Sequence, residues 1–362
     1  MRYDLLVIGD DPAGRWSAVS AAKLSKRVAI VEPPRNPLNE LEHAARAMLP
    51  EVLSDQFVAE FSVREGAPRP IAVADTSRTL ESLRSRLRFS ADLDHDVFRD
   101  LFRRYDVDTF HGDARLIDEH TVLVDDELRS FWLEAHRIVI ATGSRPRRPE
   151  RLPNDDTAIV DACTVWSQPA LPNGSAIVVG AGMTGATHAA LLASLGVPVS
   201  LIDGRENALA DCHQTTRELL EACRLTGKVV QFFGEEAIAA EQLANGLLRV
   251  VLTTGARVTC ELVLLALERL GVTEHLNLSA AGLNADENGR LWCDGYYRTF
   301  VSHIYGLGDV VGYPQSRMSA MDQGLRLVRH AFHTSRTRTT AMRHHLAELR
   351  RSAVIGRERA IA

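Results

Sequence analysis

A glycine-rich stretch with the spacing of a dinucleotide phosphate loop contains Gly180, Gly182 and Gly185. The apolar run at 176–179 before it has the length and β-branched content of a buried strand, and an Ala/Leu-rich helical segment follows. Gly180 permits a tight turn, Gly182 lets the backbone approach a pyrophosphate, and Gly185 lets the helix pack closely on the strand. The helix N-terminus offers free N–H groups to an anion. The pattern predicts dinucleotide binding, and the alternative is a glycine loop that only packs.

A carboxylate follows this loop at the separation that ribose recognition requires. The second apolar segment, 197–202, ends at Asp203, which can accept hydrogen bonds from an adenosine ribose. Asp203 suits the free 2′-hydroxyl of NAD, whereas Arg205 can meet the 2′-phosphate of NADP or can be only a solvated charge. We therefore expect NAD(P) here, with NAD favoured and NADP left open.

The N-terminus repeats this unit with one departure. Residues 3–32 have the pattern of strand, turn, small-residue helix and second strand, which ends at Glu32. Asp11 stands at the position of the central glycine, and Asp10 lies beside it. A side chain there narrows the approach to a phosphate, and its charge repels one. The first loop is therefore expected either to bind a second nucleotide or to have lost its ligand.

Composition limits the class of protein. The chain has 362 residues and 45% hydrophobic content, which suffices for two α/β domains, and it contains no apolar run of membrane-spanning length. A strand begins close to Met1 and leaves no room for a signal peptide, so a cytoplasmic protein is expected. The net charge of −5 gives no general reason to expect nucleic acid or membrane binding.

The cysteines do not form a recognisable motif. No C-x-x-C or C-x-x-x-x-C pair occurs, so neither a zinc site nor a local redox disulfide is predicted. Reduced and mostly buried thiols are expected. The five cysteines are Cys163, Cys212, Cys223, Cys260 and Cys293.

Further motifs complete a family resemblance. They are G-x-x-P-A-G in the first loop, Glu32, I-V-I-A-T-G-S-R-P at 138–146, the second glycine loop, and I-Y-G-L-G-D at 304–309. Together they resemble the flavoproteins with two dinucleotide-binding domains that are related to dihydrolipoamide dehydrogenase, the pyridine nucleotide-disulphide oxidoreductases. The runs at 293–315 and 321–324 resemble the soluble pyridine nucleotide transhydrogenases within that family. The resemblance covers residues 1–332 and is weakest at 33–107.

The resemblance implies an α/β fold with two Rossmann-like three-layer nucleotide-binding domains, the NAD(P) domain being inserted in the FAD domain. It places the first FAD segment at 1–150, the NAD(P) domain at 151–267 and the second FAD segment at 268–332. FAD and NAD(P) are the implied cofactors. Residues 333–362 form a basic tail, which is expected to be solvated, with recruitment of a partner or nucleic acid as a weaker alternative.

The resemblance also implies roles for individual residues. Glu32 would bind the adenosine ribose of FAD, and Asp309 the ribityl chain and pyrophosphate region, although Asp309 alone could equally be a helix N-cap. The residues expected to hold FAD are Gly9, Pro12, Ala13, Gly14, Glu32, Ala114, Ala141, Thr142, Gly143, Gly308 and Asp309. The residues expected to hold NAD(P) are Gly180, Gly182, Met183, Gly185, Asp203 and Arg205. No catalytic side chain is assigned, because the cofactors carry the hydride chemistry.

The sequence departs from the family at several positions. The segment 33–51 has no cysteine and no lysine where relatives carry a redox C-x-x-x-x-C motif or a flavin-contacting lysine, so disulfide reduction by the usual route is excluded. Thr187 replaces a glutamate expected beside the nicotinamide. Ser316 and Arg317 replace small apolar residues, and Arg317 would either stabilise an anionic reduced flavin or face solvent. The C-terminal domain that makes the family dimer is expected to be missing.

Two functions follow from these observations. The first is an FAD-dependent NAD(P)H oxidoreductase that transfers hydride between nicotinamide and flavin and then to an unidentified acceptor, and the family resemblance implies transhydrogenase-like activity. The second is a degenerate relative that binds a nucleotide or a partner and has lost flavin chemistry. The second is favoured by Asp10, Asp11, Thr187 and the changed segment 33–51.

Overall fold

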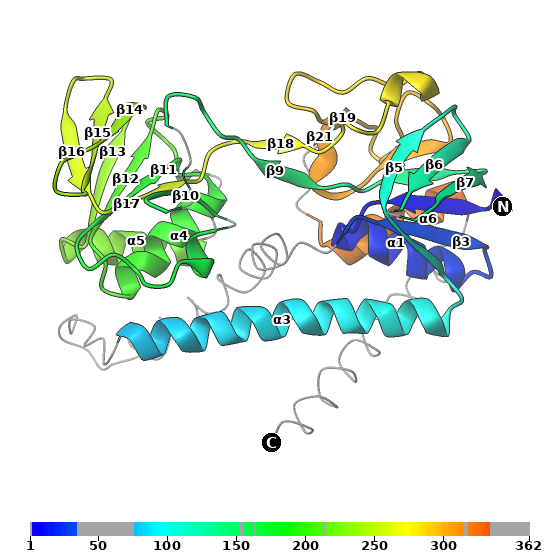
Figure 1. Cartoon of the computed structure of the whole chain (residues 1–362), viewed down its shortest axis with the longest axis horizontal. Coiled ribbons are helices and arrows are strands. Elements are labelled where there is room, and N and C mark those ends of the chain that lie inside the picture. The colour runs from blue at the N-terminus through cyan, green and yellow to red at the C-terminus, as the bar shows by residue number, and fades with distance from the viewer. Residues whose placement is uncertain are drawn as a thin grey trace. The chain divides into compact units, whose positions relative to one another are not determined.

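Strands and helices alternate along most of the chain, and their contacts divide it into two units (Figure 1). Unit 1 comprises Met1–Arg35, Leu93–Arg145 and Arg269–Ala362, and unit 2 comprises Asn36–Asp92 and Pro146–Glu268. The computed structural model describes residues 2–34, 76–126, 128–152, 155, 157–162, 164–210, 212, 214–313 and 318–333.

Unit 1 is built on a five-stranded parallel sheet with the strand order β20-β8-β2-β3-β4. Its strands are β2 (Leu5–Ile8), β3 (Val28–Glu32), β4 (Asp108–His111), β8 (Ile138–Ile140) and β20 (Ile304–Gly306). All residues of β2, β3, β8 and β20 are buried, as expected where both faces of a parallel sheet are covered.

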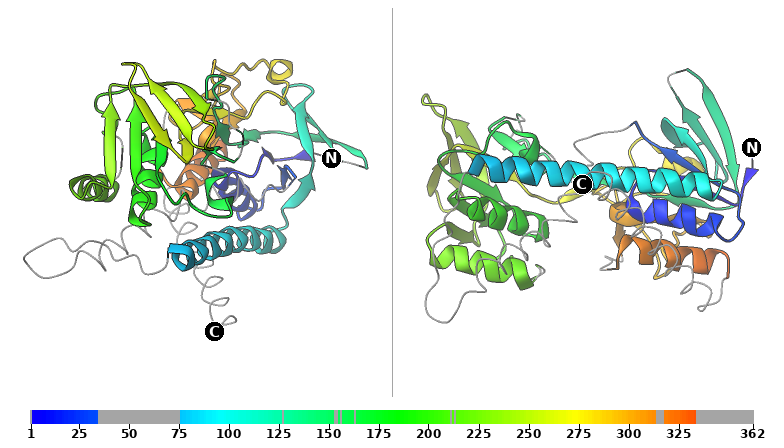
Figure 2. Two further views of the ribbon diagram at one scale, coloured as in Figure 1. Left: turned by 60° about the vertical axis from the view of Figure 1, so that its left-hand side comes forward. Right: turned by 90° about the horizontal axis from the view of Figure 1, so that it is seen from below.

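Helices cover one face of this sheet and a second sheet packs on the other. Helices α1 (Pro12–Ala22) and α6 (Ala320–Ala331) lie side by side (Figure 2), and Gly324 permits the approach because a Cβ there would lie 2.8 Å from the Ser17 nitrogen. The second sheet has the order β1-β7-β6-β5. Its strands are β1 (Arg2–Tyr3), β5 (Asp113–Leu116), β6 (Thr121–Asp125) and β7 (Ser130–Ala135).

The strand register of unit 1 aligns the carboxyl ends of four strands. Ile8 pairs with Val31 of β3 and with Ile140 of β8, and Gly306 of β20 also pairs with Ile140. The residues that follow these strands therefore meet at one edge of the sheet, which is where open α/β sheets bind ligands.

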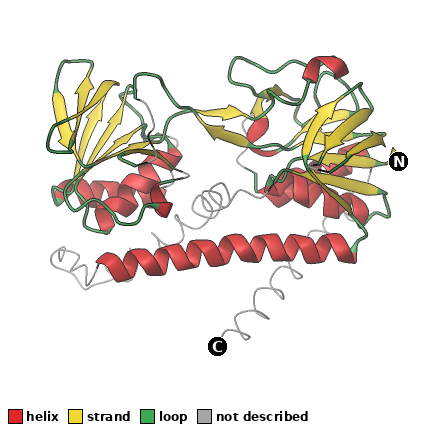
Figure 3. Cartoon of the chain, in the orientation of Figure 1, coloured by secondary structure: helices red, strands yellow, loops and turns green. Residues whose placement is uncertain are grey.

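Unit 2 repeats this plan with the strand order β10-β17-β11-β12-β13, all parallel. The strands are β10 (Ile159–Asp161), β11 (Ala176–Val179), β12 (Val199–Asp203), β13 (Val229–Phe233) and β17 (Leu262–Leu265). Helices α4 (Met183–Ser194) and α5 (Gln214–Leu225) cover one face (Figure 3). An antiparallel sheet of β14 (Ala237–Gln242), β15 (Leu248–Leu252) and β16 (Arg257–Cys260) packs on the other.

Short elements and one long helix complete the described chain. In helix α3 (Thr76–Arg104), Leu87 belongs to the core of unit 2, and Phe98 to that of unit 1. The short pieces are β9 (Ser144–Pro146), η1 (Val165–Ser167), β18 (Arg269–Gly271), η2 (Leu278–Ala281), β19 (Leu291–Trp292), η3 (Gly308–Val310) and β21 (Val311–Tyr313). Among the helices described, none has the length and apolar character needed to cross a membrane.

The predicted α/β fold with two Rossmann-like units is confirmed by these two parallel sheets. The contacts divide the chain near 146 and 268, and an inserted NAD(P) domain at 151–267 stays a prediction. Residues 76–92, which the sequence placed with the first FAD segment, group with unit 2. That each unit binds a nucleotide stays a prediction.

Candidate functional site

The loop between β11 and α4 in unit 2 has two glycines that packing requires and one that it does not. Gly180 has φ +98°, and a Cβ there would overlap the Ala266 carbonyl oxygen. A Cβ on Gly185 would overlap the Gly180 carbonyl oxygen. At Gly182 an added Cβ would meet only the Arg205 Nη2, at 3.9 Å. The space at Gly182 is therefore open, as a loop that admits a phosphate group requires.

The N-terminus of α4 lacks a side-chain cap. Gly182 is the N-cap residue and makes no side-chain hydrogen bond, so the first N–H groups of the helix face the loop without a capping side chain. The side chain of Met183, the first residue of α4, is about half exposed beside it. A helix end of this kind can accept an anionic ligand at its positive dipole end.

Asp203 ends β12, and its carboxylate already accepts four hydrogen bonds. Oδ2 accepts from the Ala181 N–H at 2.7 Å and from Arg205 Nη2 at 3.0 Å, and Oδ1 accepts from the Arg205 N–H and Nε, both at 2.9 Å. Burial opposes ionisation, but the hydrogen bonds from Arg205 and Ala181 outweigh it, and the pKa of Asp203 is lowered. A carboxylate has about four lone-pair sites, so a ribose hydroxyl would have to compete with Arg205.

Arg205 is a cation beside this loop. Its side chain is 56% exposed while its partner Asp203 is only 8% exposed, so the guanidinium reaches out of the protein above a buried carboxylate. It also lies at the open space of Gly182. This places an exposed, permanently charged group with several donors where it can bind a phosphate.

The residues behind the α4 N-terminus are packed and hydrogen-bonded. Thr187 is buried, and its hydroxyl donates to the Met183 carbonyl at 2.8 Å. This side chain therefore cannot do what a glutamate carboxylate would do at the same position. His188 stacks on Trp166, whose Nε1–H donates to His188 Nε2 at 3.0 Å, while Nδ1 bonds the Thr184 carbonyl at 2.7 Å. The sequence did not indicate this His188–Trp166 pair, because its members lie 22 residues apart on different elements.

In unit 1 the equivalent helix N-terminus is occupied by a side chain. Asp11 is the N-cap of α1, is 6% exposed, and accepts from the Ala13 N–H at 2.9 Å. Its Oδ2 also accepts from the Asp309 N–H at 3.4 Å, and a Cβ added at Gly308 would overlap its carboxylate. The Asp11 side chain thus lies between the start of α1 and the turn that follows β20.

The predicted ribose acid of unit 1 is also paired within the chain. Glu32, the last residue of β3, accepts from Arg15 Nε at 3.0 Å and lies 3.0 Å from Arg15 Nη2. Both side chains are largely buried, at 13% exposed for Arg15 and 10% for Glu32. Arg15 also lies 3.8 Å from Asp10 and over the ring of Phe98.

Other predicted FAD residues do meet at the carboxyl edge of the unit 1 sheet. Gly9 (φ +106°) and Gly143 (φ +69°) make turns after β2 and β8, and Ser144 Oγ donates to Asp309 at 3.2 Å. The Thr142 hydroxyl is buried without a hydrogen-bond partner, which is the kind of group that a ligand or water satisfies. Ala114 of β5 is a buried core residue.

The fit of a dinucleotide diphosphate therefore differs between the two loops. The α4 N-terminus and Gly182 leave room for one. At the α1 N-terminus a carboxylate occupies the capping position, and its charge and volume oppose a diphosphate in the usual place. Several positions discussed in the sequence analysis lie outside the described residues. They are the segment from 35 to 51, Ser316, Arg317 and the tail from 334.

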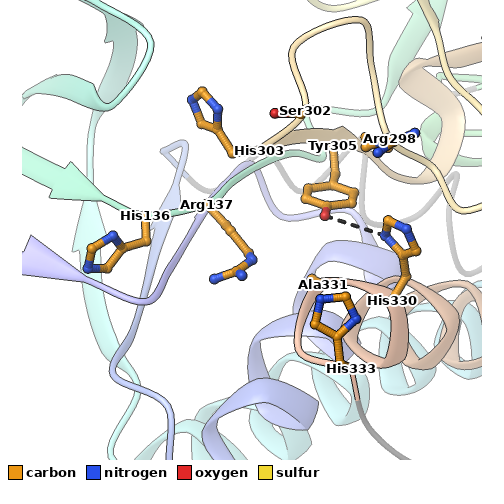
Figure 4. A pocket seen from close by; sticks show the side chains of 9 residues that line it. All are labelled: His136, Arg137, Arg298, Ser302, His303, Tyr305, His330, Ala331 and His333. Carbon is orange, nitrogen blue, oxygen red and sulfur yellow. Dashed lines mark hydrogen bonds between the residues drawn. The ribbon is translucent and has the colours of Figure 1, made fainter.

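A third feature of unit 1 is a basic pocket of about 410 Å³ (Figure 4). His136 and Arg137 directly precede β8, and His303 precedes β20, so these residues lie at the amino edge of the sheet, opposite the glycine loop. Burial lowers the pKa of His330, and its ring meets the Tyr305 hydroxyl at 3.5 Å. The full lining is His136, Arg137, Arg298, Ser302, His303, Tyr305, His330, Ala331 and His333.

The described histidines, cysteines and carboxylates are not clustered as metal ligands, and the described cysteines are buried. Within the residues described, no cluster of His, Cys, Asp and Glu could hold a metal ion. Cys212, Cys223, Cys260 and Cys293 are buried free thiols, and Cys163 lies outside the described residues. Burial raises the pKa of Cys260 and of Cys293 to about 12, so these two are not thiolates at neutral pH.

The sequence is similar to a family model and to characterised proteins. The family model described as pyridine nucleotide-disulphide oxidoreductase matches residues 3–324. A soluble pyridine nucleotide transhydrogenase from Mycobacterium bovis is 34% identical over 344 residues, which are 91% of this chain and 70% of that protein. Another, from Chromohalobacter salexigens, is 34% identical over 331 residues, with 89% of this chain and 69% of that protein covered.

Solved structures share the fold. The flavoprotein disulfide reductase RclA from Escherichia coli, in a Cu(II) complex, matches with a TM-score of 0.70 at 20% identity, covering 92% of this chain and 71% of that one. LpdA from Mycobacterium tuberculosis matches with a TM-score of 0.72 at 22% identity, covering 92% and 73%. At this level of identity the similarity concerns the fold.

Proposed function

Because this chain belongs to the pyridine nucleotide-disulphide oxidoreductase family, we propose that unit 2 binds a pyridine nucleotide at the loop between β11 and α4. The open space at Gly182 carries the proposal. Packing demands glycine at Gly180 and Gly185 but not at Gly182, so the central glycine is the one whose absent side chain serves a ligand. The N–H groups at the start of α4 would hold the pyrophosphate. When bound, the nicotinamide supplies hydride chemistry.

The preferred nucleotide is NADP(H). The sequence by itself favours NAD, because Asp203 stands at the ribose position. The four hydrogen bonds on the Asp203 carboxylate leave little capacity for a 2′-hydroxyl, and the exposed Arg205 guanidinium beside it suits a 2′-phosphate. A nucleotide that carries the extra phosphate therefore gains a charge-assisted contact, whereas NAD(H) must displace Arg205 from Asp203.

Nucleotide titration tests this proposal. NADPH and NADH are added to the purified full-length protein, and binding is followed by nicotinamide fluorescence. We expect saturable binding with the lower Kd for NADPH. Gly182→Ala should weaken NADPH binding while the thermal unfolding midpoint changes little, because Gly182 has φ −65° and space for a methyl group. No saturable binding of either nucleotide, or equal binding by a folded Gly182→Ala variant, would contradict the proposal.

A flavin-dependent oxidoreductase is the second candidate. It is supported by the family membership and by the unsatisfied Thr142 hydroxyl at the carboxyl edge of the unit 1 sheet, which a bound ligand would satisfy. The visible spectrum of the purified protein decides this candidate, since bound flavin absorbs in the visible region. Steady-state oxidation of NADH and NADPH with an artificial acceptor is the second measurement. Flavin bands together with turnover would establish the second candidate, and their absence after incubation with FAD would remove it.

A further inference from the structure

We propose that unit 1 closes its own nucleotide site: the Asp11 carboxylate takes the place of a dinucleotide diphosphate at the start of α1, and replacing it with a small neutral residue opens the site to FAD. Closure of this site concerns unit 1 alone and does not depend on nucleotide binding in unit 2. It opposes the flavin-dependent second candidate, which requires the wild type to bind FAD. The proposed closure rests on what Asp11 contacts, on how Glu32 is paired, and on the rest of the loop being intact.

The Asp11 carboxylate makes the contacts that a phosphate would make at a helix N-terminus. It accepts from the Ala13 N–H at 2.9 Å in the first turn of α1. It also accepts from the Asp309 N–H at 3.4 Å, and it fills the space beside Gly308. An anion that binds both a helix N-terminus and a neighbouring backbone N–H satisfies the donors that a diphosphate would otherwise use.

A second internal contact occupies the ribose-binding carboxylate. Glu32 is paired with Arg15, and both side chains are about nine-tenths buried. Since Arg15 comes from the first turns of α1, the same helix supplies both the cap and the cation. The acidic residue that would accept ribose hydroxyls thus already has a charged partner.

The loop between β2 and α1 otherwise keeps the backbone geometry of a glycine-rich phosphate loop. Gly9 keeps a left-handed φ of +106°, and a Cβ there would overlap the Ala141 carbonyl oxygen. A Cβ on Gly14 would overlap the Ala141 methyl group. Asp11 itself has φ −54° and ψ 136°, which glycine and serine adopt without strain. The obstruction is therefore a side chain, and it can be removed by substitution without remaking the loop.

Substitution of Asp11 is expected to leave the protein folded. Asp11 acts as an N-cap, and glycine at an N-cap is only slightly worse than aspartate, while serine is about as good. Asp11→Gly removes both the charge and the volume, and Asp11→Ser removes the charge but keeps a capping hydroxyl. Asp10→Asn is the matched control, because Asp10 is 44% exposed and contacts only Arg15 among the ion pairs described.

Equilibrium dialysis with FAD, alongside thermal unfolding, tests the inference. We expect no saturable FAD binding by the wild type or by Asp10→Asn. We expect saturable FAD binding by Asp11→Gly, with a Kd lower than any wild-type Kd by on the order of a hundredfold or more. Asp11→Ser should bind FAD more weakly than Asp11→Gly does. Flavin absorbance that comigrates with Asp11→Gly on gel filtration is the second readout.

Three results would overturn it. The first is wild-type protein that carries stoichiometric FAD or binds it as tightly as Asp11→Gly. The second is a folded Asp11→Gly variant without FAD binding; if that variant does not fold, a folded Asp11→Ser variant without binding decides in its place. The third is an equal gain in Asp10→Asn, which would show that net charge and not the position of Asp11 controls binding.

Discussion

The two glycine loops of this chain share their outer geometry and differ at the middle. Each begins with a glycine at positive φ, +106° at Gly9 and +98° at Gly180. At the central position unit 1 has Asp11, which caps α1, and unit 2 has Gly182, which leaves α4 without a side-chain cap. The outer glycines therefore build the turn, and the central residue decides whether the chain or a ligand meets the helix N-terminus.

The carboxylates that end the second strands differ in a related way. Glu32 is paired with Arg15, which is only 13% exposed, whereas Asp203 is paired with Arg205, which is 56% exposed. An arginine that lies mostly in the protein serves the internal pair. An arginine that reaches solvent can serve the pair and a ligand together. Both units thus pair a buried carboxylate with an arginine, but only in unit 2 is the arginine exposed.

The largest effect is expected where the two loops agree. Gly185→Ala should destabilise the protein by about 3 kcal/mol, because the added methyl group would overlap the Gly180 backbone, which cannot move aside cheaply. Gly14→Ala, whose methyl would meet the Ala141 side chain, should cost less. Urea unfolding of both variants measures the difference. An unchanged midpoint for Gly185→Ala would show that the third glycine of unit 2 is not required by packing.

The central residue of the unit 1 loop can be placed in the unit 2 loop by substitution. Gly182→Asp installs in unit 2 the residue type that closes unit 1. NADPH affinity should fall by on the order of a hundredfold, because a capping carboxylate would occupy the α4 N-terminus and repel the pyrophosphate. Stability should hold or rise by roughly a few tenths of a kcal/mol through the new N-cap. Retained NADPH affinity in a folded Gly182→Asp variant would show that a carboxylate at the central position does not exclude the nucleotide.

Arg205 distinguishes the two nucleotides. Arg205→Gln should weaken NADPH binding by about tenfold, corresponding to one charge-assisted hydrogen bond, and should affect NADH much less. Arg224→Gln is the control, since Arg224 is also an exposed arginine of unit 2 and pairs with Glu221. Titrations of both variants with both nucleotides measure the ratio of Kd values. An equal loss for NADH and NADPH would assign Arg205 a structural role.

The smallest effect concerns acid stability. The folded pKa of Asp203 is lowered, so its ionised form stabilises the protein above its ordinary pKa of 3.8, and this stability is lost as the pH falls through the folded value. Asp203→Asn should therefore lower the unfolding midpoint at neutral pH, and the gap to wild type should narrow at the acid end. A gap that does not change with pH would mean that the Arg205–Asp203 pair adds no charge-dependent stability.

Local spacing in the sequence predicted the elements of both loops. Strand, glycine turn and helix follow one another within a few residues, so hydrophobic period and glycine placement are enough to find β2–α1 and β11–α4. The same spacing placed Glu32 and Asp203 at the ends of the next strands, where the structure has them. The alternation of strands and helices also indicated the α/β fold class.

Tertiary structure decided what these residues contact. Asp11 meets Asp309, 298 positions away, only because β2, β8 and β20 are aligned in one parallel sheet. The basic pocket likewise brings together His136 and His330, which are far apart in the sequence. Local sequence thus placed two glycine loops, each between a strand and a helix. Strand register and side-chain packing decided that the Asp11 carboxylate contacts the Asp309 N–H and that the space at Gly182 stays open, since contacts between distant segments depend on how the sheet assembles.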